Sequence, residues 1–428
     1  MPKSIKFIII LVFLSFSLPK TQAEEILSWQ DCVREAKAKN PDLVSAQEKL
    51  NQTKADKAIA KSKLFPQVDL SNEYAYKTAT SKASETRAVT HDYTYFKLTG
   101  KQLAFDGFKV SNKVAEALEN IKSSEYGYMV TSSNLRLDLR RAFVELLRAQ
   151  ELLKITEEIA KRRRDNLILV TLNYESGREN KGSLLTIQAD LEESKLEVLQ
   201  AQRLIQSAQV KLCKRLGRIE VAHVKTQGDF IVASLNRQRP DFDALTKANP
   251  LLKEIIAKKQ AAVFNLKSAK ADFFPSIYAN ASRERDHIGK PRDNTSEWSV
   301  GGSLSFPIFE GGLRIAEVSR ARALYEQLVA DERSTGNNVT VTLAEKWKAL
   351  QDFMDEVKTR QIILEAAQDR AKITQLQYSM GLVSFNDWII IEDALINAKK
   401  IFLDVRSSLL IAEAEWVQAK GGTLDYEE

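Results

Sequence analysis

The side chains that most often carry catalysis or bind metals are few in this chain and widely spaced. There are three histidines, His91, His223 and His287, and two cysteines, Cys32 and Cys213. No second ligand stands near any histidine at the spacing that zinc sites use. Acids and serines are plentiful, but no nucleophile, base and oxyanion-binding group come together, and the G-x-x-x-x-G-K-[ST] phosphate loop does not occur. The sequence therefore predicts no enzyme, no metal site and no cofactor.

Residues 1–23 have the pattern of a secretory signal peptide. Lys3 and Lys6 precede an apolar run from Phe7 to Leu18, and small residues follow as far as Ala23. This run is shorter than the about 20 residues that a membrane-spanning helix needs. We expect an exported protein, with a retained anchor helix as the alternative.

The charge of the chain gives no support to a nucleic-acid partner. The chain has 63 Lys+Arg and 57 Asp+Glu, and its densest basic run is Arg162 to Arg164. A nucleic-acid footprint needs a clustered basic face. On a long helix we interpret this run as a solvated turn, and we predict no nucleic-acid partner.

The elements that must position any functional residue are long helices. No proline occurs at residues 67–239 or 308–428, and proline breaks a helix interior. Apolar residues spaced alternately four and three apart run through 187–212 and again through 391–416, which is typical of coiled-coil packing. The chain is thus predicted to be mainly helical.

Four short motifs occur twice, in the same order. They are Asn-Pro-x-Leu, Phe-Pro, Phe-(Asp/Glu)-Gly and Tyr-x-x-Gly, at 40–43 and 249–252, 65–66 and 274–275, 105–107 and 309–311, and 174–177 and 378–381. We interpret 24–228 and 229–422 as two copies of one structural repeat, followed by a C-terminal tail at 423–428.

Each repeat is predicted to contain a helix, two strands, a very long helix, a tight turn and a further helix. Alternation of apolar and small polar residues, clearest from Trp298 to Phe306, indicates strands. The first repeat would have a helix ending at residue 64, a β-hairpin at 67–105, a long helix at 108–175 and a helix at 183–217. The second would have a helix at 250–273, a β-hairpin at 276–307, a long helix at 312–379 and a helix at 386–420.

Four strands cannot close on themselves, and open strand edges in a membrane leave backbone groups unpaired. If the apolar strand faces meet lipid, several chains must share one barrel, and the protein must be an oligomer.

This ordered, duplicated motif set behind a signal peptide resembles the outer-membrane efflux proteins of the TolC type, over nearly the whole chain. The resemblance implies a mainly α fold with a small β part. A long α-helical coiled-coil barrel would continue four β-strands per protomer, which contribute to a shared trimeric, twelve-stranded transmembrane β-barrel. It also implies a homotrimer in contact with outer-membrane lipid, with a long periplasmic extension.

The function that the resemblance implies is a passive exit duct of a tripartite efflux or type I secretion system. A periplasmic adaptor, or membrane fusion protein, would join it to an inner-membrane RND or ABC transporter. The cargo and the kind of transporter stay open. The alternative is a soluble periplasmic coiled-coil scaffold or adaptor, against which the paired strands argue.

The resemblance also assigns roles to residues of the two Tyr-x-x-Gly turns. It implies a pore gate at Tyr378 and Asp387, although a helix-capping role stays open for Asp387. Adaptor docking would use Gly177, Arg178, Gly381 and Leu382. We expect the first turn to be three residues longer than the second, with Thr186 opposite Asp387. Val383 and Ile390 stand where some family members carry a gate arginine and a second acid.

The short helices of each repeat would stack end to end beside the long one in the resembled fold. Cys213 would then approach the segment that contains Cys32. In an oxidising periplasm we hypothesise a Cys32–Cys213 disulfide, with two small buried apolar residues as the alternative.

Overall fold

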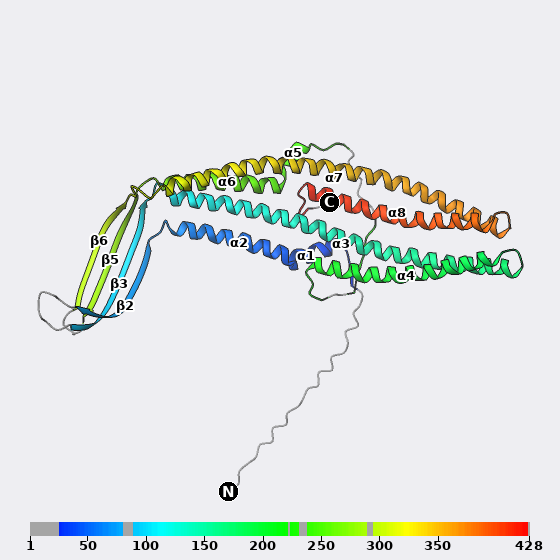
Figure 1. The fold of residues 1–428 in the computed structure, drawn as a ribbon, viewed down its shortest axis with the longest axis horizontal. Coiled ribbons are helices and arrows are strands. Elements are labelled where there is room, and N and C mark those ends of the chain that lie inside the picture. The colour runs from blue at the N-terminus through cyan, green and yellow to red at the C-terminus, as the bar shows by residue number, and fades with distance from the viewer. Residues whose placement is uncertain (1–24, 80–88, 221–222, 231–237, 289–293, 427–428) are drawn as a thin grey trace, which may run out of the picture.

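The structure is a computed structural model that describes residues 25–79, 89–220, 223–230, 238–288 and 294–426. The predicted signal peptide lies outside these residues. The molecule is a long helical body with a β-sheet at one end and two helix-to-helix turns at the other (Figure 1).

Two very long helices run through the body, α3 (Lys109–Glu175) and α7 (Leu313–Ser379), each of 67 residues. At 1.5 Å per residue each is about 100 Å long. Each is flanked by two shorter helices that follow one another along it (Figure 1). These are α2 (Pro41–Ser62) and α4 (Lys181–Leu216) beside α3, and α6 (Pro250–Ala271) and α8 (Phe385–Ala419) beside α7.

The sheet has the strand order β2-β3-β5-β6, and every pairing is antiparallel. Pairing of β3 with β5 joins the hairpin of one repeat to that of the other, which leaves β2 and β6 as the two edges. The strands are β2 (Gln67–Ala79), β3 (Val89–Phe105), β5 (Ser276–Ile288) and β6 (Asn294–Ser305).

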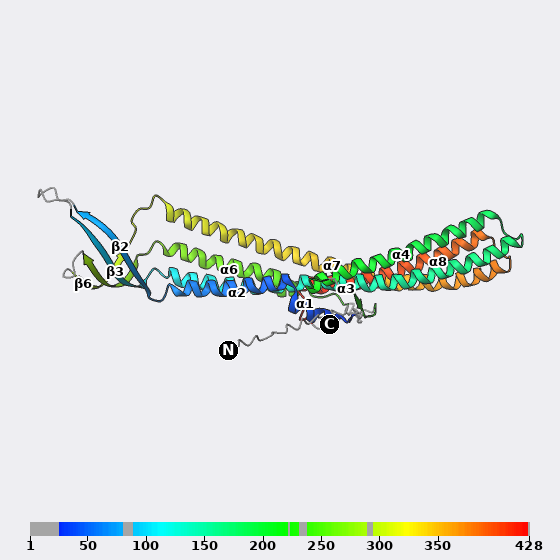
Figure 2. The same cartoon turned by 90° about the horizontal axis from the view of Figure 1, so that it is seen from below.

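The two long helices differ in how many neighbours cover them. Helix α3 packs against α2, α4, α6 and α8, so it lies in the middle of the helical layer. Helix α7 packs against α6 and α8 and, over a short stretch, α5 (Phe242–Ala248). One side of α7 is therefore left at the margin of the body (Figure 2).

Short elements around the middle of the body were absent from the sequence-based prediction. They are α1 (Trp29–Lys39), α5, and two three-residue strands, β1 (Glu25–Leu27) and β4 (Val224–Thr226), which pair in parallel. Three residues are too few for a periodic pattern, and the two strands lie about 200 positions apart.

The two stacked helix pairs meet at junctions built from the same residues in both repeats. In the first, Oδ1 of Asn40 accepts hydrogen bonds from the N–H of Asp42 (2.9 Å) and Leu43 (3.3 Å) and caps α2. Its Nδ2 donates to the carbonyl oxygen of Arg215, 2.9 Å away in the last turn of α4. One side chain thereby serves the start of one helix and the end of the other.

The second junction repeats this arrangement. Oδ1 of Asn249 accepts from the N–H of Leu251 and its Nδ2 donates to the carbonyl oxygen of Ala419, both at 2.9 Å. Gly217 (φ +81°) and Gly421 (φ +84°) follow the two incoming helices, and a Cβ there would collide with the backbone of Lys39 and the ring of Pro250, respectively. The Asn-Pro and Gly motifs are therefore the parts of an end-to-end helix joint.

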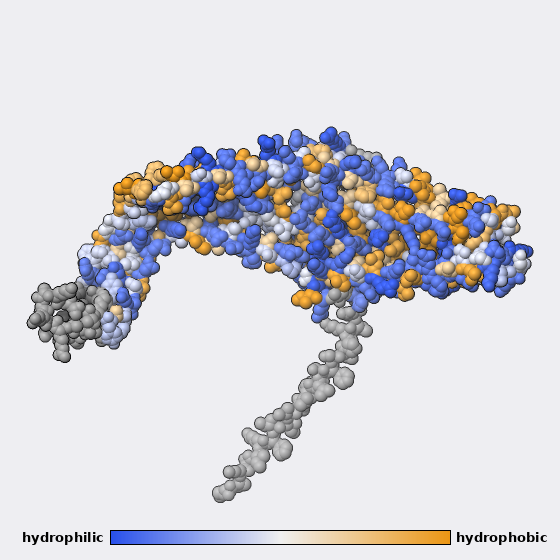
Figure 3. All heavy atoms as spheres, in the orientation of Figure 1, coloured by the Kyte–Doolittle hydropathy of each residue, from blue (hydrophilic) through white to orange (hydrophobic). Residues whose placement is uncertain are grey.

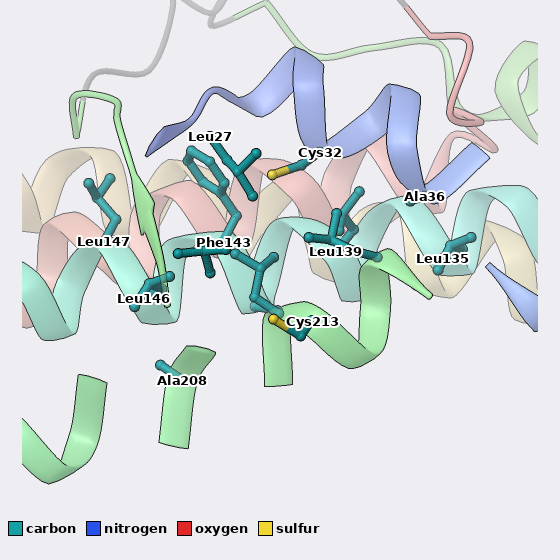
Figure 4. Packing of buried hydrophobic residues seen from close by; sticks show 14 of the residues in the cluster. Leu27, Cys32, Ala36, Leu135, Leu139, Phe143, Leu146, Leu147, Ala208 and Cys213 are labelled. Carbon is teal, nitrogen blue, oxygen red and sulfur yellow. The ribbon is translucent and has the colours of Figure 1, made fainter. Parts of the chain in front are cut away.

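The hypothesised disulfide is not formed in this structure. Cys32 on α1 and Cys213 on α4 are both buried in one apolar cluster and are not joined by a disulfide. Helix α3, which carries Leu139 and Phe143 of the same cluster, runs between the segments that carry the two cysteines (Figure 4). The prediction was wrong because α2 meets the end of α4, whereas α1 packs across α3 and its cysteine points at the core. Burial, the largest cause, raises the pKa of the Cys32 thiol to about 12, so it stays protonated.

Candidate docking and gating tip

The end of the molecule opposite the sheet consists of two turns of equal length. The first joins α3 to α4 through residues 176–180, and the second joins α7 to α8 through residues 380–384. The expected difference of three residues was wrong, because Asn180 caps α4 by accepting a hydrogen bond from the N–H of Ser183 (3.0 Å), and the helix starts at Lys181. Ser183, and not Thr186, is thus the counterpart of Asp387.

The two turns share one backbone conformation. Gly177 has φ 74° and Gly381 has φ 75°, the left-handed region that ends many helices. The N–H of each glycine donates to the carbonyl oxygen of the tyrosine three residues earlier, at 3.0 Å in both turns. The N–H groups of the next residues, Arg178 and Leu382, donate to the carbonyl oxygens of the residues just before the two tyrosines, at 2.8 and 2.9 Å. No atom lies within 4 Å of a Cβ built on either glycine.

The exposed surfaces of the turns are opposite in chemistry. The first turn presents the charged side chain of Arg178, and Lys181 follows it at the start of α4. The second presents Met380 and Leu382, whose side chains are 65% and 68% exposed. All four adaptor-docking residues predicted from the sequence, Gly177, Arg178, Gly381 and Leu382, are accessible at this end of the molecule.

Behind the turns, an apolar cluster joins all four helices; we call it the tip core. Tyr378 is 4% exposed, and its ring is stacked on that of Trp388 with centroids 4.3 Å apart and planes 9° from parallel. The repeat counterpart of Tyr378, Tyr174, is 38% exposed. The tip core consists of Val170, Ile187, Tyr378, Phe385 and Trp388.

Tyr378 also ties the second hairpin to the first turn. Its hydroxyl donates to Oε2 of Glu179 at 3.0 Å. Burial, the largest cause, and Glu179 raise the pKa of Tyr378 to about 12, against an opposing hydrogen bond with Asn173. The phenol therefore stays a neutral hydrogen-bond donor. Val383 occupies the matching position in the second turn and has no carboxylate to offer Tyr174.

Asp387 is exposed and belongs to the start of α8. Ser384 Oγ donates to its Oδ2 at 2.7 Å and accepts from its N–H at 3.2 Å. The structure thus gives Asp387 the capping geometry that the sequence left open. It does not bring Asp387 and Tyr378 into a hydrogen bond, so a joint gate role stays a prediction.

Further from the turns, ion pairs join α3 to α8, with the bases mostly on α3. Arg162 binds Glu392 through two hydrogen bonds, one of 2.7 Å, although Glu392 is fully buried. Arg163 pairs with Asp393 and lies 3.4 Å from Asp190 of α4. The interpretation of Arg162 to Arg164 as a solvated turn was therefore wrong for Arg163, which is 7% exposed. The two adjacent acids at 392–393 were the feature of the sequence that could have predicted ion pairs with these arginines.

No group of three His, Cys, Asp or Glu residues with a geometry suited to a metal ion occurs in the described ranges. Within those ranges, too, no helix combines the length and the apolar character needed to cross a membrane.

The arrangement of motifs and elements is that of a known family. The model of the family described as outer membrane efflux protein matches residues 32–218 and 243–422. The chain belongs to this family. As an outer membrane efflux protein, it is located in the outer membrane and forms part of an efflux channel.

Relatives and solved structures agree with this assignment. The chain is 23% identical over 412 residues to a probable efflux pump outer membrane protein of Pseudomonas putida, TtgC, covering 92% of this chain and 82% of that protein. The fold matches the CmeC outer membrane channel of Campylobacter jejuni with a TM-score of 0.83 at 17% identity, over 94% and 87% of the two chains. It matches VceC of Vibrio cholerae with a TM-score of 0.79 at 18% identity, over 93% and 97%. The predicted fold class is confirmed.

Proposed function

We propose that this efflux protein is the passive exit duct of a tripartite pump. The observation that carries the proposal is the placement of two exposed turns and an open-edged sheet at opposite ends of one helical body about 100 Å long. Such a body reaches far from the membrane, and its turns are where a partner can meet it. The duct has no energy source of its own in this scheme, so an inner-membrane transporter of the RND or ABC type drives export.

The functional unit is a homotrimer. Edge strands β2 and β6 have free backbone groups that need partners in lipid, and they run antiparallel to one another. The β6 edge of one copy can therefore pair with the β2 edge of the next until three sheets close.

The helical body supports the same assembly. Helix α7 exposes Val341, Ile362 and Ile373 at the margin of the protomer, and α4 exposes Leu185 and Leu199 at the other margin. Figure 3 shows further apolar residues among charged ones over the face in view, with groups beside the sheet and toward the turns. Apolar surface on this scale favours burial against another chain.

A periplasmic adaptor is the partner at the turns. Met380 and Leu382 fit an apolar groove between helices of the adaptor, whereas Arg178 and Lys181 fit acidic side chains. Because the two turns differ in chemistry, the adaptor meets two kinds of site per protomer. Close packing against the turns also requires small residues, which Gly177 and Gly381 provide.

Small organic molecules are the proposed cargo, in preference to secreted proteins. The observation that favours them is the likeness to a protein named as a toluene efflux pump outer membrane protein, 23% identical over 412 residues. Type I secretion is the second candidate function, since the same body would serve it.

The gate is placed at the turn end. The bond from Tyr378 to Glu179 holds the two hairpins of one protomer together, and Asp387 lies exposed at the start of α8. In the trimer the three Asp387 carboxylates face the entrance and attract cations. Asp387→Ala should therefore weaken block by divalent cations in planar bilayers. Asp387→Asn removes the charge but keeps the hydrogen bond from Ser384, so it separates the effect of the charge from that of the helix cap.

Cross-linking at the turns tests the whole proposal. A photo-reactive amino acid at Leu382 should capture the adaptor in cells, and the same group at the exposed Asn51 of α2 is the matched control. The detergent-extracted protein should have the mass of a trimer. Recovery as a soluble periplasmic monomer would instead support the scaffold alternative.

A further inference from the structure

Buried polar atoms without a hydrogen-bond partner gather in one place near the turns. Six such side-chain atoms occur in the described part of the chain, and four belong to this place. They are Nδ2 and Oδ1 of Asn166, Nε1 of Trp388, and Nη1 of Arg163, which makes no hydrogen bond but lies in an ion pair 3.4 Å from Oδ2 of Asp190. Asn166 is 1% exposed and Trp388 is fully buried. We call Arg163, Asn166 and Nε1 of Trp388 the Asn166 layer.

The Asn166 layer lies between two contacts that hold the helices together. Asn166 precedes Val170 of the tip core by about one helical turn, and Trp388 itself belongs to that core. Arg163, on the other side, pairs with Asp393 of α8 and Asp190 of α4. Together with Arg162 and Glu392, this pair joins α3 to α8 on the side away from the turns.

Buried polar groups without a hydrogen-bond partner in the protein disfavour the packed state. A buried donor or acceptor without a partner bears its full cost of desolvation, whereas an apolar side chain of similar shape does not. When the helices part at this level, water reaches the atoms of Asn166 and Trp388 and removes that cost. The layer therefore makes separation of the helices easier here than in an apolar core.

The second repeat has no matching layer. Position 370, which corresponds to Asn166, is an arginine with an exposed side chain, and the counterpart of Arg163 is Ala367. The polar layer is thus a feature of the place where α3 faces the second hairpin, not of the repeat as such.

We propose that the Asn166 layer is the level at which the α3–α4 and α7–α8 hairpins separate when the tip opens. Asn166 is then a positioning residue for the gate. The ion pairs between α3 and α8 on one side of it stay formed, while the helices on the turn side move apart. This inference rests on the proposed gate, but its consequence for the helices is measured without any transport.

Hydrogen exchange of the full-length trimer tests the inference. Asn166→Leu replaces two unpaired polar atoms with apolar ones of similar volume. Amides of residues 166–175 and 385–395 should exchange at least about fivefold more slowly than in the wild type, the effect of relieving about one unpaired polar group. Amides around Leu343 and Leu350, far from the turns, should keep their wild-type rates.

Asn397→Leu is the matched control, because Asn397 is an exposed residue of α8, and its exchange pattern should be that of the wild type. Unchanged or faster exchange at the turns of Asn166→Leu overturns the inference. Slowing that extends equally to Leu343 and Leu350 also overturns it, since the layer would then affect only global stability. If the leucine variant does not assemble, Asn166→Met is judged by the same criteria. Either negative result leaves the proposed duct standing, because the duct is judged by cross-linking.

Discussion

At the two helix junctions the repeats keep the same buried side chains, whereas at the two turns they keep the Tyr-x-x-Gly motif and its backbone but differ in their exposed side chains. Asn40 and Asn249 each cap one helix and donate to the end of another, and Gly217 and Gly421 each lie close to the Asn-Pro segment of the same junction, against Lys39 and Pro250, respectively. At the turns, the glycine conformation and hydrogen bonds are preserved while Arg178 is replaced by Leu382.

The difference separates what the fold needs from what a partner needs. A junction is surrounded by its own chain, so a change of side chain disturbs packing that both repeats require. A turn projects into solvent, so the repeats can diverge there without cost to the fold. Divergence on a preserved backbone is what we expect of two docking sites with different chemistry.

The largest expected effect is a loss of stability when a junction glycine is replaced, which should exceed the loss at a turn glycine. Gly217→Ala should lower the free energy of unfolding by about 2–4 kcal/mol, since it adds a clash with Lys39 to an unfavourable φ. Gly177→Ala meets no atom and should cost only about 1 kcal/mol. Urea unfolding of the detergent-solubilised variants, followed by circular dichroism, compares them. Equal losses would remove the distinction between junction and turn.

Equal losses in both repeats are expected for the junction asparagines. Asn40→Ala and Asn249→Ala should each cost about 2 kcal/mol, because each removes a helix cap and leaves a carbonyl group of the other helix unpaired. Ser384→Ala removes a cap and an exposed hydrogen bond to Asp387 but no bond to a second helix, and should cost about 1 kcal/mol. The same unfolding assay applies. A large effect of one asparagine and none of the other would show that the junctions are not equivalent.

A smaller effect should distinguish the two turn tyrosines. Tyr378→Phe loses the hydrogen bond to Glu179 and should cost about 1 kcal/mol, with faster amide exchange at residues 176–184. Tyr174→Phe is the matched control and should change neither quantity. If the control behaves like Tyr378→Phe, the hydrogen bond between Tyr378 and Glu179 does not distinguish the two turns.

The smallest expected effect is an opposite response of the two regions to acid. Near the first junction, a hydrogen bond from Arg218 lowers the pKa of Glu35, so its contribution to stability is present at neutral pH and is lost as pH falls through that lowered pKa. Near the turns, burial is the main cause that raises the pKa of Asp190. Its ionised form costs stability, and that cost disappears as pH falls through the raised pKa.

Amide exchange corrected for its intrinsic pH dependence measures both responses. As pH falls from neutral toward about 4, exchange around Asp190 should slow while exchange in α1 stays constant, and α1 should loosen only at lower pH. Asp190→Asn should abolish the response near the turns. Persistence of that response in the variant would assign it to another group.

Much of the fold follows from local signals in the sequence. Proline-free stretches and the paired Gly and Pro motifs predict long helices with ends close to those observed, such as 108–175 against Lys109–Glu175. Alternation predicts the strands. These signals are short in range, so they do not depend on the rest of the chain.

Features that arise from distant contacts were missed. The β1–β4 pair and the burial of Arg163 depend on segments about 200 positions apart. The disulfide failed for the same reason: stacking of α2 on α4 was expected, but the path of α1 across α3 was not. The length of the first turn was misjudged because the helix was expected to start at residue 183, whereas capping by Asn180 starts it at Lys181.

The most direct test of the central claim is accumulation of a fluorescent small-molecule pump substrate in cells that lack this protein. Our account predicts that deletion raises accumulation and that the wild-type gene restores it. Leu382→Glu should fail to restore it although the protein reaches the outer membrane as a trimer, because a buried carboxylate disrupts docking of the adaptor. Unchanged accumulation on deletion, across substrates of the cell's pumps, would contradict the assignment as an efflux duct.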